Sequence, residues 1–209
     1  MCVWVCDTCL DIGAYTHAFY NNMNYYYVIG GRHYARVSYV ISQLHPSEAV
    51  YPVATSGVSA AMLGTIMHKN IEDYMNGNKA SQFELKPQLE QFIAAHITGK
   101  WRLFSSEERI WDAEMRIAGT VDALYFNNET SQFMIVDWKR TRGLYPDSAI
   151  QYQLQLNIYK RILARMGRDV VSMGLAVLHP DNATFKWVDV PDVDVSKFVD
   201  NAKHLVPDS

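Results

Sequence analysis

The sequence predicts an α/β (α+β) fold with a mixed central β-sheet flanked by helices. This prediction rests on the order of the patterns along the chain: helical segments come first, alternating apolar strands follow, and a helix and a continuous apolar strand come last. The chain has 209 residues, of which 49% are hydrophobic and 20% are charged. This length and composition allow one domain with a full hydrophobic core.

The first 30 residues differ in character from the rest of the chain. They contain Cys2, Cys6 and Cys9, followed by a tract rich in Asn and Tyr that has no clear period. We therefore expect residues 1–30 to be an N-terminal extension of unclear role, ahead of a domain that spans residues 31–209. The chain shows no internal repeat.

Three segments before residue 100 are predicted to be regular: residues 36–44 as a helix or a strand, and residues 56–76 and 87–98 as helices. Each is followed by a residue that ends such an element, either a glycine or a His-Pro pair. Ser56 or Ser59 can cap the start of the longer helix, and Gly77 follows its end.

The middle of the chain is predicted to be β-structure. Residues 104–113, 114–126 and 132–139 form alternating apolar runs, and a polar turn-forming cluster separates the last two. These two runs therefore predict a β-hairpin. Asp122 and Asp137 are equidistant from the midpoint of its turn, so they should face each other with their Cβ atoms about 5 Å apart.

The last third of the chain predicts one helix and two strands. Asp147 or Ser148 can cap a helix over residues 149–166. Residues 170–178 form a nearly continuous apolar run, which fits a strand buried on both faces. Residues 184–190 are expected to be the last strand.

The predicted hairpin concentrates charge on one face. Lys139 shares the face of Asp137 because side chains alternate along a strand. Aspartate is poorly suited to strand interiors, and a buried carboxylate without a partner is costly. Two carboxylates facing each other destabilise a sheet unless a cation lies between them. Asp122 and Asp137 are therefore the predicted ligands of a hard divalent ion.

Four motifs of this chain, in this order, resemble those of the PD-(D/E)XK nuclease superfamily and of its RecB-like exonuclease branch: His68 after Gly64, Gly119-Thr120-Val121-Asp122, Asp137-Trp138-Lys139, and Gln155 with Tyr159 four residues later. The resemblance covers residues 56–190 and implies a restriction-endonuclease-like core. The chain is also similar to nuclease-like proteins of large DNA viruses, particularly over residues 156–180.

The resemblance implies metal-dependent hydrolysis of DNA phosphodiester bonds, by an exonuclease that acts on single strands or ends in DNA repair and recombination. It implies Asp122, Asp137 and Lys139 as catalytic residues. His68 and the backbone carbonyl of Trp138 would join the two aspartates as metal ligands. Because these ligands are mostly oxygens, Mg²⁺ is the expected cofactor, with Mn²⁺ as a substitute.

Substrate contacts are expected from the segment that follows the hairpin. Residues 139–168 contain seven Lys or Arg and one Asp, a net charge of +6, although the whole chain has a net charge of −3. Such a cationic lane can hold a phosphate backbone; a solvated basic helix face is the alternative. The candidate substrate-binding residues are Gln155, Tyr159, Arg140, Lys160 and Arg161. For Tyr159 and Gln155, core packing and solvation are the alternatives.

Two acidic residues could support the site from neighbouring elements. Glu72 shares a helix face with His68, because the two are four residues apart. Glu108 lies on the strand that precedes Asp122 and could reach the site from there. For Glu72, the alternative is a solvated helix face.

The cysteines leave other functions open. Cys2, Cys6 and Cys9 match the cluster-loop spacing of radical S-adenosylmethionine enzymes, and with His17 they could bind zinc. Reduced, structural thiols are the favoured interpretation. Because no cysteine follows Cys9, we expect no iron–sulfur cluster of the RecB-like type.

A catalytically silent nuclease-like module that binds nucleic acid and works with a helicase is the alternative function. The sequence contains no G-x-x-x-x-G-K-[ST] motif, so any unwinding must come from a partner, a helicase or another replication or repair protein. No apolar run reaches the length of a membrane span, and the N-terminus lacks the pattern of a secretory signal. We therefore expect an intracellular, soluble protein, in the cytoplasm or nucleus, that binds DNA and no membrane.

Overall fold

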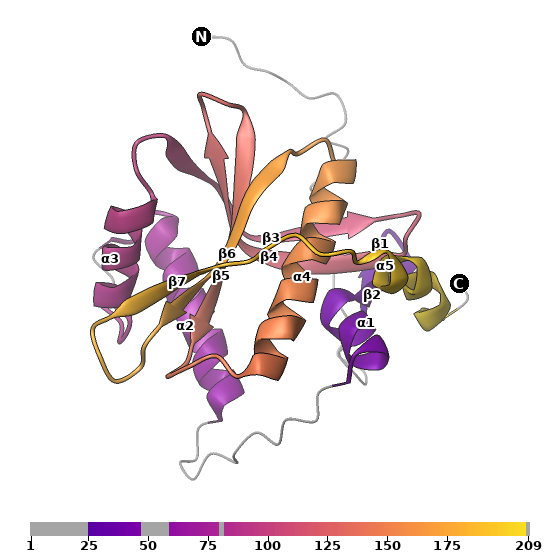
Figure 1. Ribbon diagram of the computed structural model, residues 1–209, viewed down its shortest axis with the longest axis horizontal. Coiled ribbons are helices and arrows are strands. Elements are labelled where there is room, and N and C mark those ends of the chain that lie inside the picture. The colour runs from indigo at the N-terminus through magenta and orange to yellow at the C-terminus, as the bar shows by residue number, and fades with distance from the viewer. Residues whose placement is uncertain (1–24, 47–58, 80–81, 208–209) are drawn as a thin grey trace.

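Within residues 25–46, 59–79 and 82–207, which the computed structural model describes, seven β-strands form one mixed sheet (Figure 1). The strands are β1 (Tyr26–Ile29), β2 (Arg32–Arg36), β3 (Trp101–Asp112), β4 (Ile117–Asn127), β5 (Gln132–Arg140), β6 (Val170–Leu178) and β7 (Phe185–Asp189). Six of them follow the order β1-β2-β4-β5-β6-β7. The remaining strand, β3, pairs with β4 and lies outside this order. The pairs β2–β4 and β5–β6 are parallel, and the others are antiparallel.

Helices cover both faces of this sheet (Figure 1). They are α1 (Val37–Leu44), α2 (Ala60–Met75), α3 (Lys86–His96), α4 (Pro146–Arg165) and α5 (Ser196–Ala202), followed by a 3-10 turn over Lys203–Leu205. One hydrophobic core joins the sheet to α1, α4 and α5, and a second joins it to α2 and α3. The predicted class, a mixed sheet flanked by helices, is confirmed.

The central hairpin has the predicted register. β4 and β5 pair antiparallel from Asn127↔Gln132 to Ala123↔Val136, and the Asn127 side chain accepts hydrogen bonds from two backbone N–H groups of the turn. Side chains of β5 alternate between the two cores, with Ile135 in the core of α4 and Val136 in the core of α2. Asp137 therefore belongs to the face covered by α4, two residues after Ile135.

One predicted helix cap, Ser59, is confirmed, and the predicted caps of α4 are wrong. Ser59 caps α2, because its hydroxyl accepts a hydrogen bond from the N–H of Met62. Ser56 lies outside the described residues. Helix α4 starts at Pro146, so the predicted caps Asp147 and Ser148 are wrong: both lie inside its first turn. Proline suits this first position because its missing N–H would be unpaired there anyway.

Two strands at the start of the described chain were not predicted. β1 and β2 form a tight hairpin through Gly30 and Gly31, both with positive φ. Residues 36–44, predicted as a helix or a strand, form α1 directly after β2. β1 lies within the predicted extension of residues 1–30, so at least these four residues join the sheet. Cys2, Cys6, Cys9 and His17 lie outside the described residues.

The strand predicted over residues 114–126 starts later than expected. The Asp112 carboxylate accepts hydrogen bonds from the N–H groups of Glu114 and Met115, which makes a turn before β4 begins at Ile117. An aspartate often stabilises a turn in this way. No helix in the described part of the chain has both the length and the apolar composition needed to cross a membrane.

Candidate active site

Strand β4 changes partners in the middle of the sheet, and the candidate site lies at this change. β4 pairs with β2 at Ile117 and Ala118, and with β5 only from Ala123 onwards. The register of β4 and β5 would place Asp122 opposite Asp137, but the ladder stops one pair earlier. There the N–H of Trp138 donates to Oδ2 of Asp122 at 2.9 Å. The Asp122 carboxylate thus occupies the opening between the two strands.

Helix α2 and strand β3 bring two further ligating groups to Asp122. Nδ1 of His68 lies 3.2 Å from Oε1 of Glu107 and 3.5 Å from Oδ2 of Asp122. One ligand atom from each of the three residues lies within 4.8 Å of the others. His68 therefore lies beside Asp122, and its predicted role as a metal ligand stays a prediction.

Glu107 was missed by the sequence analysis, which chose its neighbour Glu108. The carboxylate of Glu108 instead pairs with Arg168 at 2.7 Å and accepts a hydrogen bond from Ser105. β3 has a register shift between Leu103 and Ser105, and Glu107 has a left-handed backbone with φ of 49°. Such irregularities redirect side chains, so strand alternation alone could not show which glutamate reaches the site.

Asp137 and Lys139 form an ion pair on the α4 side of the opening. Nζ of Lys139 lies 2.5 Å from Oδ2 of Asp137 and 4.6 Å from the ring centroid of Tyr152. Asp137 is only 2% exposed. Burial, followed by the charge of Asp137, raises the pKa of Asp122 to about 7. Burial alone would lower the pKa of Lys139, but Asp137 and Asp122 outweigh it and hold that pKa above its usual value.

Helix α4 contacts Asp137 through Gln155, which also contacts Tyr159. Nε2 of Gln155 lies 3.1 Å from the Tyr159 hydroxyl and 3.5 Å from Oδ1 of Asp137. The Tyr159 ring covers Gly119, where a Cβ atom would clash with it. Burial, and then the charges of the two aspartates, raises the pKa of Tyr159, so its hydroxyl stays protonated. This geometry suits the orientation of a carboxylate; direct contact with substrate stays a prediction.

The donor set fits a divalent cation. Three carboxylates, from Glu107, Asp122 and Asp137, reach this opening with one imidazole, and one lysine is their only close ammonium group within the described residues. Hard cations such as Mg²⁺ and Mn²⁺ prefer carboxylate oxygens. A bound cation would also offset the repulsion that raises the pKa of Asp122. The ligand role of the Trp138 carbonyl stays a prediction.

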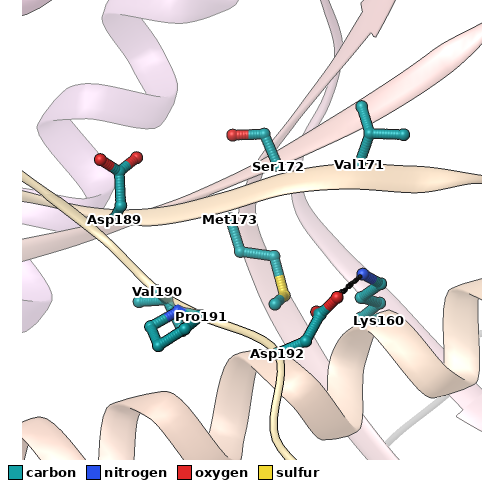
Figure 2. A pocket seen from close by; sticks show the side chains of 8 residues that line it. All are labelled: Lys160, Val171, Ser172, Met173, Asp189, Val190, Pro191 and Asp192. Atoms are coloured by element: carbon teal, nitrogen blue, oxygen red, sulfur yellow. Dashed lines mark hydrogen bonds and ion pairs between the residues drawn. The ribbon is translucent and has the colours of Figure 1, made fainter.

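The predicted cationic lane is largely neutralised by acids. Lys160 pairs with Asp192 at 2.7 Å and lines a separate hollow of about 260 Å³ between β6, α4 and the segment after β7 (Figure 2). Arg161 donates to the hydroxyl of Ser196 at 3.2 Å. The other carboxylate pairs are Arg140 with Glu84, Arg142 with Asp181, Arg165 with Asp112 and Glu114, and Arg168 with Glu108.

Glu72, the second acidic candidate, lies on α2 but engages a lysine. Its carboxylate is 3.1 Å from Nζ of Lys69, which also pairs with Asp73 at 2.9 Å. Glu72 does not belong to the group formed by His68, Glu107 and Asp122. The alternative of a solvated helix face therefore describes its position.

Comparison with known proteins identifies the family of this chain. The PD-(D/E)XK nuclease superfamily matches residues 80–205, which include Glu107, Asp122, Asp137 and Lys139. No similar protein was found among the curated proteins. Among solved structures, "Crystal structure of SSO0001" matches with a TM-score of 0.40 and 18% identity, over 71% of this chain and 62% of that one. The chain thus spans less than two thirds of that protein. The family match extends over more than half of the present chain, which therefore belongs to the PD-(D/E)XK nuclease superfamily.

Proposed function

We propose that this protein is a metal-dependent nuclease that hydrolyses DNA phosphodiester bonds, as an exonuclease acting on single strands or ends. One observation carries the proposal: Asp122, Asp137 and Lys139 converge where β4 and β5 separate, and His68 and Glu107 reach the same opening. A catalytically silent binding module would not need three buried or half-buried carboxylates in one place. Without a cation, such crowding destabilises the fold through desolvation and mutual repulsion.

The residues of the site divide the work of hydrolysis. Asp122, Asp137, Glu107 and His68 would hold a divalent cation, which would supply Lewis-acid chemistry to the scissile phosphate. The ammonium group of Lys139 lies beside Asp137, where it can orient the attacking water and stabilise negative charge as it develops. Gln155 donates to Asp137 and helps to hold its orientation, and the same amide nitrogen donates to the Tyr159 hydroxyl.

The choice of substrate rests on the four motifs rather than on contacts. Their RecB-like pattern supports DNA over RNA, and single strands or ends over internal duplex. It also supports a helicase or another replication or repair protein as partner, since no P-loop motif for nucleotide binding occurs in the sequence.

Cleavage of labelled DNA tests the proposal. End-labelled linear and circular DNA, each single- and double-stranded, is incubated with the protein in magnesium, in manganese and in EDTA. We expect linear single strands to be shortened from an end only in the presence of a divalent ion. Asp137→Asn should abolish cleavage, whereas the matched control Asp200→Asn, an exposed aspartate on α5, should not.

Each outcome of this assay has a defined meaning. Cleavage of circular single strands, which have no ends, would show that the protein is an endonuclease rather than an exonuclease. Cleavage that persists in EDTA, or that Asp137→Asn leaves intact, would overturn the proposed site. Binding without any cleavage under all conditions would favour a catalytically silent module.

A further inference from the structure

Two arginines of the sheet, Arg36 and Arg109, flank the aromatic ring of Tyr27. The guanidinium carbon of Arg36 lies 4.4 Å from the ring centroid, and that of Arg109 lies 6.0 Å from it. Among the residues that the structure describes, neither arginine pairs with a carboxylate, and the buried Nε of Arg36 has no hydrogen-bond partner. These two cations therefore differ from Lys160 and Arg165 of α4, which have acidic partners.

The arginines and Tyr27 lie beside the candidate active site. Arg109 is the partner of Thr120 across β3 and β4, and the same register places Glu107 level with Asp122 two residues further on. Two residues of a strand span about 7 Å. The Tyr27 hydroxyl lies 3.1 Å from Oγ1 of Thr120, which connects β1 to β4 at this level. We call Tyr27, Arg36, Arg109 and Thr120 the Tyr27 cluster.

The start of helix α1 adds to the positive potential of this cluster. Arg36 is the N-cap residue of α1, no side chain caps this end, and no acidic residue lies in its first turn. The first N–H groups of a helix have no partners within the helix and carry partial positive charge. The Tyr27 cluster therefore combines two guanidinium groups, the start of a helix and two hydroxyls.

This chemistry selects an oxyanion. Guanidinium groups bind phosphate oxygens in a planar, forked geometry, and nearby hydroxyls can donate further hydrogen bonds. The carboxylates beside the cluster repel a free anion, but a nucleic-acid strand can pass one phosphate over the cation site and the next over the arginines. Contacts of this kind position the strand without reading its sequence.

We propose that the Tyr27 cluster binds the backbone phosphate next to the one that is cut, on the same strand. This inference rests on the proposed function, because it takes Asp122 and Asp137 as the place of cleavage. The cluster would set the register in which the strand enters the site. Arg36 and Arg109 are then substrate-binding residues, and Tyr27 positions them through its ring.

Binding of single-stranded DNA tests this role without requiring cleavage. The variants are Arg36→Gln, Arg109→Gln and both together, and the matched control is Arg102→Gln. Arg102 is also an exposed arginine of β3 stacked on an aromatic ring, at 5.3 Å from the ring centroid of Phe126. The affinity for a labelled oligonucleotide is measured in EDTA at several salt concentrations.

We expect the double variant to bind at least about tenfold more weakly at low salt. The slope of log affinity against log salt should fall by about 0.7, the value for one phosphate contact on a single strand. Arg102→Gln should bind like the wild type. If the double variant keeps the wild-type slope, the proposal is overturned, even if its melting temperature falls. If Arg36→Gln does not fold, Arg109→Gln decides the question, because Arg109 is exposed.

Neutralising single phosphates of the oligonucleotide locates the contact. Each phosphate in turn is replaced by an uncharged methylphosphonate. The wild type should lose affinity at one or two positions, and the double variant should not respond at those positions. An unchanged response in the double variant overturns the proposal. A protein that passes these binding tests but never cleaves DNA would disprove the proposed function and leave the phosphate site standing as a binding site.

Discussion

The candidate active site and the surface of α4 arrange their charges in opposite ways. In the site, Glu107, Asp122 and Asp137 share one lysine and one histidine, and burial with mutual repulsion raises the pKa of Asp122 to about 7. On α4, Lys160 and Arg165 each meet an acid from a neighbouring segment. The active site thus has more negative charge than its own cations neutralise and is electrostatically incomplete, whereas these two cations of α4 are balanced by nearby acids.

This difference separates a functional role from a structural one. Charges that meet partners within the protein contribute modestly to stability and leave little for a ligand to gain. Charges that crowd together without partners destabilise the fold until a ligand of opposite sign binds. The net charge of residues 139–168 therefore misleads as a guide to DNA binding. The arginines of the Tyr27 cluster, which pair with no carboxylate among the described residues, are the phosphate-binding groups that we propose instead.

The largest expected effect comes from removing one charge of the incomplete region. Asp122→Asn should lower the rate of DNA cleavage at least about 100-fold, because the transition state loses electrostatic stabilisation. Asn can still accept the hydrogen bond from Trp138. Melting in metal-free buffer should be unchanged or higher, since carboxylate repulsion is relieved. Thermal unfolding and initial cleavage rates check this, and a large loss of stability would contradict the comparison.

Adding the missing cation should stabilise the wild type. At a magnesium concentration 100 times its dissociation constant, the free energy of unfolding should rise by about 2.7 kcal/mol. Asp122→Asn should show a much smaller rise. Melting curves recorded over a magnesium titration, with sodium chloride added to match ionic strength, measure the difference. An equal rise in both proteins would place the cation elsewhere.

A packing change tests how α4 contributes to the site. Gly119→Ala places a methyl group against the ring of Tyr159, so the ring or β4 must move. We expect a loss of about 1–3 kcal/mol in stability, typical of overpacking, and slower cleavage as Gln155 loses its hold on Asp137. Gly64→Ala on α2 is the control, because nothing lies within 4 Å of its added Cβ. Denaturant unfolding and cleavage assays compare the two variants.

The smallest effect is expected in the balanced region. Arg165→Gln removes partners of Asp112 and Glu114 but leaves the Asp112 turn intact. Arg165 and Glu114 are exposed, and exposed ion pairs contribute little. Asp112 is buried but keeps the hydrogen bonds from the N–H groups of Glu114 and Met115. The melting temperature should therefore fall by no more than a few degrees, and DNA affinity should stay within about twofold of the wild type. A loss of DNA affinity as large as that from Arg109→Gln would show that α4 holds the strand after all.

Much of the site could be predicted where its residues are close in sequence. Asp122, Asp137 and Lys139 belong to one hairpin, whose short turn sets the register and hence their mutual position. The family match over residues 80–205 confirms the superfamily that the ordered motifs resemble. His68 was expected beside them only through that resemblance, since α2 precedes the hairpin by some 40 residues and no local rule places it there.

The sequence by itself determined the α/β class, the register of the central hairpin that carries both aspartates, and the Ser59 cap of α2 as one of two alternatives. Local rules suffice for these, because turn chemistry, side-chain alternation and capping act over a few residues. Only the tertiary structure decided that Glu107 rather than Glu108 reaches the site, which cations of residues 139–168 are neutralised, and that Tyr27, Arg36 and Arg109 meet. These outcomes depend on a strand irregularity and on contacts between segments far apart in the chain, where packing and desolvation across the whole fold select one partner among many.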